Sequence, residues 1–142
     1  MYLTAEKSLC KKRQAKVVSK DKKQTRIHRA INPGKKFELR HYRLDGEIVE
    51  NETCCDFLLI NDSTQKAYFI ELKGKNIDQA ISQLEAGKKK FESELHGYSF
   101  YFRIVCSKAP THKVRSTEFR KFQEKYGIRL QMKERELEEI LA

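Results

Sequence analysis

Apolar positions along the chain predict a series of strands. Residues 36–44 (KFELRHYRL) alternate polar and apolar side chains and favour a half-buried strand, which Asp45-Gly46 would end in a turn. Residues 54–60 (CCDFLLI) and 66–73 (KAYFIELK) are short apolar runs separated by NDSTQ, and together they predict a hairpin of two buried strands. We expect two further strands at residues 98–106 and 128–133.

Helical patterns alternate with these strands. The apolar residues from Ile77 to Leu95 keep helical spacing, and Asn76 with Gln79 forms a capping pair, so residues 77–95 predict an amphipathic helix. Helices are also expected at residues 4–18, with Thr4 as the N-cap, at residues 116–127 and at residues 134–142. This order of elements predicts an α/β fold, in which a mixed central sheet carries helices on its faces.

Length and composition agree with one domain spanning residues 1–142. A chain of 142 residues with 39% hydrophobic side chains can bury a core of its own. No apolar run approaches the roughly 18 residues that a membrane-spanning helix needs. The chain begins without an apolar signal segment, and its four cysteines lack paired spacing. We therefore expect a cytoplasmic protein that has no membrane partner.

Positive charge is concentrated in residues 1–36, called here the basic segment. It holds 12 Lys or Arg and 2 acids (12 − 2 = +10), whereas residues 37–142 hold 18 of each sign, so the net charge of +10 lies entirely in it. Such a block indicates contact with a polyanion, because neutralising phosphates releases counterions. A solvated arm is the alternative. The residues expected to contact nucleic acid are Lys11, Lys12, Arg13, Lys22, Lys23, Arg26 and, outside the segment, Lys75.

Two carboxylates and a lysine fall on the predicted hairpin. Side chains alternate along a strand, so Glu71 and Lys73 share one face, and strand pairing would bring Asp56 close to Glu71. Buried charges of this kind need partners or a metal ion. Asp56 and Glu71 would hold Mg²⁺, with the Leu72 carbonyl as a third ligand. Lys73 would orient water or stabilise developing negative charge, the chemistry of phosphodiester hydrolysis. A structural Glu71–Lys73 pair at an exposed strand end is the alternative.

Asp56 followed by Glu71-Leu72-Lys73, on these strands and before the helix, resembles the PD-(D/E)XK nuclease superfamily and its restriction-endonuclease-like fold. The resemblance covers roughly residues 36–106. It implies an endonuclease that cleaves DNA, less often RNA, with Mg²⁺ or with Mn²⁺ in its place. It also suggests a homodimer or a partner subunit. Cys55 stands where the name-giving pattern has proline.

Two accessory positions follow from the resemblance alone. Many members carry a glutamate on the first helix, which implies Glu6, and other acids are alternatives: Glu38, Glu47 and Glu50. The polar residue on the helix after the lysine would be Gln79 or Gln83, although helix capping and surface solvation account for both glutamines equally well. The alternative function is a nucleic-acid-binding module without catalysis, or a subunit of a larger nucleoprotein assembly.

Overall fold

The computed structural model describes residues 1–23, 25–108 and 116–142, which form an α/β protein with two mixed β-sheets and two helices. The larger sheet has the order β3-β4-β5-β6-β7. Its first three strands are antiparallel and its last three are parallel: β3 (Leu39–Arg43), β4 (Phe57–Asn61), β5 (Lys66–Lys73), β6 (Ser99–Cys106) and β7 (Leu130–Glu134). In the smaller sheet β2 pairs antiparallel with one neighbour and parallel with the other: β1 (Lys16–Lys20), β2 (Ile27–Ile31) and β8 (Glu136–Ile140).

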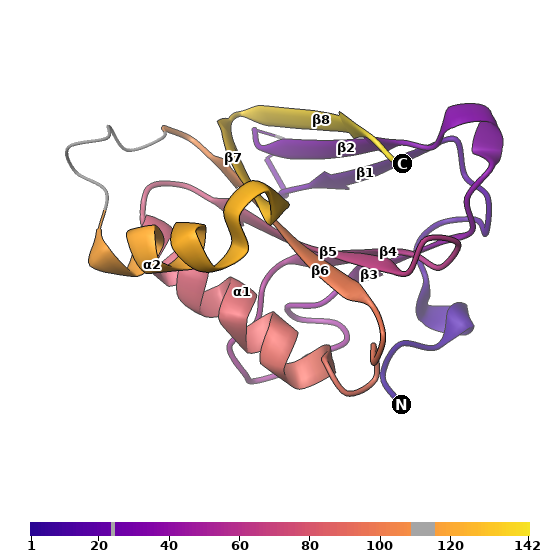
Figure 1. The fold of residues 1–142 in the computed structure, drawn as a ribbon, viewed down its shortest axis with the longest axis horizontal. Helices are drawn as coiled ribbons and strands as arrows, with labels where there is room; N and C mark the ends of the chain where they lie inside the picture. The colour runs from indigo at the N-terminus through magenta and orange to yellow at the C-terminus, as the bar shows by residue number, and fades with distance from the viewer. Residues whose placement is uncertain (24, 109–115) are drawn as a thin grey trace.

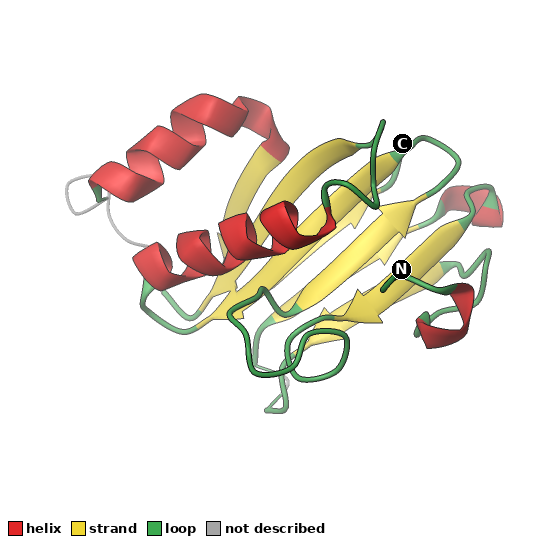
Figure 2. Cartoon of the chain, turned by 90° about the horizontal axis from the view of Figure 1, so that it is seen from below, coloured by secondary structure: helices red, strands yellow, loops and turns green. Residues whose placement is uncertain are grey.

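The described residues form three layers. Helices α1 (Ile77–Phe91) and α2 (Thr117–Tyr126) lie on one face of the five-stranded sheet, and the three-stranded sheet lies on the other (Figure 1). Figure 2 shows α1 crossing the strands on the helical side. One apolar core lies under the helices and a second lies between the sheets. The predicted α/β fold with a mixed sheet is confirmed, but the helices lie on one face of the large sheet only, because a second mixed sheet covers the other face. None of the helices among the described residues is long and apolar enough to cross a membrane.

The predicted hairpin and the helix after it are confirmed. Strands β4 and β5 pair antiparallel, with Phe57 opposite Ile70 and Asn61 opposite Lys66. The Asn76 side chain accepts the backbone N–H of Gln79, which satisfies one of the free donors at the start of α1. The helix ends at Phe91, four residues before the predicted boundary.

The predicted helix over residues 4–18 was wrong. Only Ala5–Lys7 form a 3₁₀ turn, η1, and Lys16–Lys20 are strand β1. The intervening backbone follows β3 instead of closing on itself, since the Leu9 N–H donates to the His41 carbonyl (2.6 Å) and the Leu39 N–H to that of Lys12 (2.7 Å). In β1 and β2, which follows it, every second residue is buried, a pattern too short to separate from a helix by periodicity.

The predicted C-terminal helix was also wrong, because this segment is strand β8, parallel to β2. Leu137 and Leu141 are four residues apart, which suits one face of a helix and one face of a strand equally well. The extended form also turns Glu139 toward the protein, where its carboxylate accepts bonds from Arg103 Nε (2.8 Å) and Nη2 (2.9 Å). Tertiary pairing overrides the helix propensity of a Glu- and Leu-rich segment.

Candidate functional site

Asp56 and Glu71 meet at the end of the five-stranded sheet where β5 ends. Asp56 directly precedes β4, and its backbone N–H donates to Glu71 Oε1 (3.1 Å). In return, the backbone N–H of Leu72 donates to Asp56 Oδ2 (2.8 Å). Each carboxylate therefore accepts a bond from the opposite strand, and the structure brings together the two acids that the sequence singled out.

Lys73 shares a face of the sheet with Glu71. Phe69 packs in the core under α1, and alternation along β5 places the residues two and four positions later on the same face. Leu72 packs on the other face, in the core between the sheets. The N–H and C=O of a strand residue point to the same side, so the Leu72 carbonyl faces the Asp56 side of β5, as its predicted role as a ligand requires.

Burial makes this pair of acids expensive to ionise. The Glu71 side chain is 1% exposed, and burial together with the charge of Asp56 raises the pKa of Glu71 to about 9, although Lys73 acts in the opposite direction. Burial also raises the pKa of Asp56, against the effects of the Leu72 N–H and of Arg43. Ionising both carboxyl groups at neutral pH is therefore unfavourable unless further positive charge is present.

The donor set fits a hard divalent cation. Two carboxylates and a backbone carbonyl are the oxygen ligands that Mg²⁺ takes, usually from one or two carboxylates with water and phosphate completing its shell. A cation between Asp56 and Glu71 would favour the ionised form of Glu71, against the effect of burial on its pKa. Mn²⁺ accepts the same ligand class. Among the residues described, no cluster of three or more His, Cys, Asp or Glu side chains suits a metal.

Gln83 is the better placed of the two predicted glutamines. Its Oε1 atom is buried without a hydrogen-bond partner among the described residues, whereas Gln79 is exposed. Gly87, one turn after Gln83, packs against Cys55 and Phe69. Because α1 runs back between the parallel strands β5 and β6, moving from Gly87 to Gln83 follows the direction from Phe69 to Glu71. Gln83 thus lies toward the end of the sheet that carries the acidic pair.

Glu6 lies elsewhere in the structure. Its turn η1 follows Leu3, whose carbonyl accepts a bond from Arg40 Nη1 (3.0 Å), and Arg40 pairs with Asp62 at the far end of β4 from Asp56. The structure therefore does not bring Glu6 to the acidic pair. The predicted first helix, on which its assignment depended, is absent.

Among the described residues, no hydrogen bond or ion pair joins the alternative acids to Asp56 or Glu71. Glu38 pairs with basic side chains of the N-terminal segment, and Glu47 and Glu50 are exposed in the loop between β3 and β4. An acid that the sequence did not single out does act on the site. The charge of Asp45 contributes to the raised pKa of Asp56, so Asp45 is close enough to add to the negative potential there.

Part of the basic segment reaches the same end of the sheet. Arg26 Nη1 donates to Ser107 Oγ (2.8 Å), directly after β6, and lies against Gly74, directly after β5. The β1–β2 turn that includes Lys22 and Lys23 is therefore held near the acidic pair. Lys75 is exposed just beyond the end of β5.

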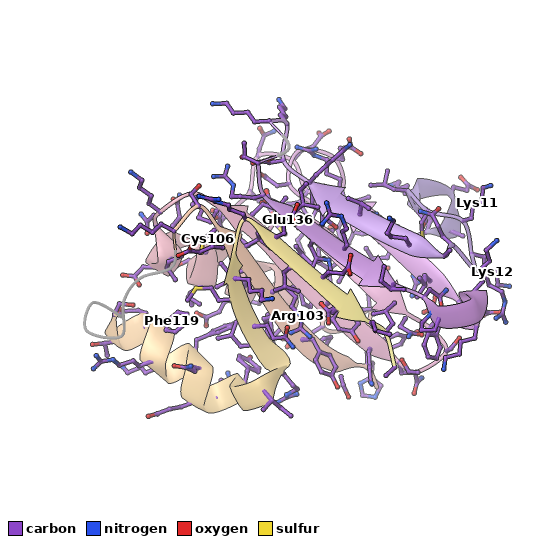
Figure 3. All side chains as sticks on the ribbon, turned by 90° about the horizontal axis from the view of Figure 1, so that it is seen from above. Lys11, Lys12, Arg103, Cys106, Phe119 and Glu136 are labelled. Atoms are coloured by element: carbon purple, nitrogen blue, oxygen red, sulfur yellow. The ribbon has the colours of Figure 1, made fainter. Side chains whose placement is uncertain are left out.

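Lys11, Lys12 and Arg13 lie at the opposite end. The Lys12 carbonyl bonds to Leu39, at the start of β3, and Figure 3 shows Lys11 and Lys12 far from Cys106, the last residue of β6. Arg13 and Lys12 also pair with Glu38. The basic residues predicted to contact nucleic acid thus form two separate groups, and the group at the candidate site consists of Lys22, Lys23, Arg26 and Lys75.

Arg43 is a candidate that the sequence analysis missed. It lies on β3 opposite Phe57, its guanidinium carbon is 5.6 Å from the centre of the Phe57 ring, and its charge lowers the pKa of Asp56. The sequence signal was its place at the end of a strand that could pair with residues 54–60, but the register of that pairing was not predictable from the pattern alone.

Comparison with family models, with curated proteins and with solved structures returned no match to this chain.

Proposed function

We propose that this chain is a Mg²⁺-dependent endonuclease that hydrolyses phosphodiester bonds in nucleic acid, with DNA as the expected substrate. The observation that carries the proposal is the buried Glu71 beside Asp56, with Lys73 on the same face of the sheet. Such an arrangement is unfavourable in the absence of a cation, which is typical of a site built to bind one. Mn²⁺ would replace Mg²⁺.

Each residue has a distinct role in this proposal. Asp56 and Glu71 would hold the ion, with the Leu72 carbonyl as a third ligand. The bound Mg²⁺ supplies positive charge that polarises the scissile phosphate. Lys73 would donate a hydrogen bond to the attacking water or to the phosphate oxygens, where negative charge develops. The buried Oε1 atom of Gln83 offers a further neutral acceptor on the α1 side.

The order of elements supports the resemblance to PD-(D/E)XK nucleases. Asp56 precedes β4, Glu71-Leu72-Lys73 closes β5, and α1 then leads to the parallel strand β6. The five-stranded sheet with α1 would be the restriction-endonuclease-like core, and the chain would act as one nuclease domain. Strands β1, β2 and β8 lie outside the residues that carry the resemblance.

The test is cleavage of labelled duplex, single-stranded and branched DNA, and of RNA, in Mg²⁺, Mn²⁺ or EDTA. The variants Asp56→Asn, Glu71→Gln and Lys73→Met remove charges, while the amides can still accept the two interstrand bonds. We expect metal-dependent cleavage that falls at least about 100-fold in each variant, the scale of losing one such electrostatic contact. Glu85→Gln, on the exposed side of α1, is the matched control and should cleave normally. Cleavage that persists in EDTA or in all three variants would refute the proposal.

A second candidate function is a nucleic-acid-binding module or nucleoprotein subunit without catalysis. The reciprocal bonds of Asp56 and Glu71 to opposite-strand N–H groups favour it, because they give both acids a structural use. It predicts no cleavage of any substrate, together with binding that weakens steeply as salt rises.

A further inference from the structure

A groove of about 350 Å³ lies between β1, at the edge of the small sheet, and β3, at the edge of the large one. Lys16, Val18 and Lys20 line it from β1, since these are the outward-facing residues of that strand. Arg43 and Phe57 line it from the β3 side. The β1 part of the basic segment, which lies away from the acidic pair, therefore forms one wall of this groove.

The groove combines positive charge with apolar surface. Its lining carries Lys16, Lys20 and Arg43 and no acid. His41, also in the lining, is held by Ser19 Oγ (2.8 Å from Nε2), and burial lowers the pKa of His41 to about 4, so the ring adds no charge at neutral pH. The exposed apolar side chains of the lining are Leu9 and Val18, while Phe57 and His41 are buried. Cations beside exposed apolar side chains suit a nucleic-acid strand, because the phosphates carry charge and the bases have flat apolar faces.

The groove is directed toward the candidate site. At one end, Lys20 continues into the turn that carries Lys22 and Lys23, which is held near the ends of β5 and β6. Arg43 links the two regions, because its guanidinium lies over Phe57 in the groove, and Phe57 directly follows Asp56 in the chain. A strand lying in the groove would thus run from Lys16 to Lys20, toward the end of the large sheet at which the acidic pair lies.

The size of the groove decides which form of nucleic acid fits. A volume of about 350 Å³ is at the lower end of small-molecule sites and suits single nucleotides in file. A cleft of this volume is too small to take in both strands of a duplex. We infer, on the basis of the proposed function, that the groove between β1 and β3 binds an unpaired strand, so that the substrate is a nucleic acid with a single-stranded segment. Its phosphates would contact Lys16, Lys20 and Arg43.

The test is binding of a fluorescent 12-nucleotide oligothymidylate and of a 12-base-pair duplex, followed by anisotropy in EDTA over a range of salt concentrations. The groove variant is Lys16→Gln with Lys20→Gln. The matched control is Lys89→Gln with Lys121→Gln, which removes the same charge from exposed positions on α1 and α2. Loss of two contacts to a single strand should lower the salt slope by about 1.4 and weaken binding about 25-fold at 0.1 M salt, from a slope of about 0.7 per contact. The control should change binding much less.

Two results would overturn the inference: equal affinities of the groove and control variants for the oligothymidylate, or a preference of the wild-type protein for the duplex. Thermal unfolding of both variants checks that their folds are intact. Because binding is measured without cleavage, this test is separate from that of the proposed function. Groove-dependent binding without any cleavage would leave the groove in place and refute the nuclease. Metal-dependent cleavage, together with equal binding by the groove and control variants, would support the nuclease and refute the groove as the binding site.

Discussion

Replacing Glu71 by Gln tests the electrostatics of the acidic pair without measuring catalysis. The pKa of Glu71 is about 9 in the folded protein and 4.5 in a solvated glutamate. Between these values the folded state binds one more proton than the unfolded state, so the folded state loses stability as pH rises, by about 1.4 kcal/mol per pH unit. Over the three units from pH 5.5 to 8.5 this amounts to about 4 kcal/mol.

The amide introduced by Glu71→Gln would keep the interstrand bond and remove the titration. Its oxygen can still accept the Asp56 N–H, which lies 3.1 Å from Glu71 Oε1 in the wild-type protein. The variant should therefore match the wild type near pH 5 and become the more stable protein in EDTA by pH 8.5. Added Mg²⁺ should stabilise only the wild type and so reduce the difference in free energy of unfolding between the two proteins. This effect should be larger at higher pH, because the ion favours ionised Glu71.

The assay is urea unfolding at pH 5.5, 7.0 and 8.5, with and without Mg²⁺, for the wild type, Glu71→Gln and the exposed control Glu85→Gln. Only differences between proteins are compared, so other titrating groups cancel. The free energy of unfolding of the control should differ from that of the wild type by the same amount at all three pH values. A free-energy difference between Glu71→Gln and wild type that stays constant from pH 5.5 to 8.5 would show that Glu71 does not hold the extra proton.

Two other substitutions test the packing around the site and the buried ion pair. Gly87→Ala should destabilise the protein by about 1–3 kcal/mol in urea unfolding, because the new Cβ would lie 2.7 Å from Cys55 Sγ. An increase in stability, which is typical when an exposed helix glycine is replaced by alanine, would contradict this packing argument. Glu139→Gln should cost about 3–5 kcal/mol, since it leaves the buried Arg103 without its carboxylate. The pKa of Glu139 is lowered to about 2, so the wild type keeps this contribution above about pH 4.5 and loses it as pH falls toward 2, which unfolding at pH 3 and 7 would measure.

The candidate site was predictable because its parts are close in the sequence. The hairpin that joins Asp56 to Glu71 needs only a short turn, and the two runs on either side are apolar enough to identify as strands. The start of α1 was equally local, since the Asn76 cap acts on a residue three positions away. What the pattern could not give was the direction of the carboxylates or the register that sets Arg43 beside Phe57.

The two segments whose secondary structure was predicted wrongly lie at the two ends of the chain, where pairing is non-local. Strand β8 is held by β2 and by the ion pair of Glu139 with Arg103, and neither partner is close in sequence. An arginine within an apolar strand does indicate that a buried acid is needed, but it does not say which of the many glutamates supplies it. Likewise, the backbone of residues 9–12 forms hydrogen bonds to β3 in place of helical ones, and the local sequence pattern does not predict this pairing.

The pairing of the two ends gives the basic segment its form. A hairpin such as β1–β2 is marginally stable alone, so its lysines would otherwise belong to a mobile arm. Strand β8 adds the third strand, and β2 is bonded at both of its ends, through Ile27 to Arg135 and through Ile31 to Leu141. Val17 and Leu137 then bury this sheet on the large one. The excess positive charge, which composition alone links to a polyanion, therefore lies on an ordered surface. The β1 lysines line one edge of the small sheet, and the β1–β2 turn lies at the end of the large sheet that carries the acidic pair. Ordering these lysines during folding means that less conformational entropy is lost when a strand binds.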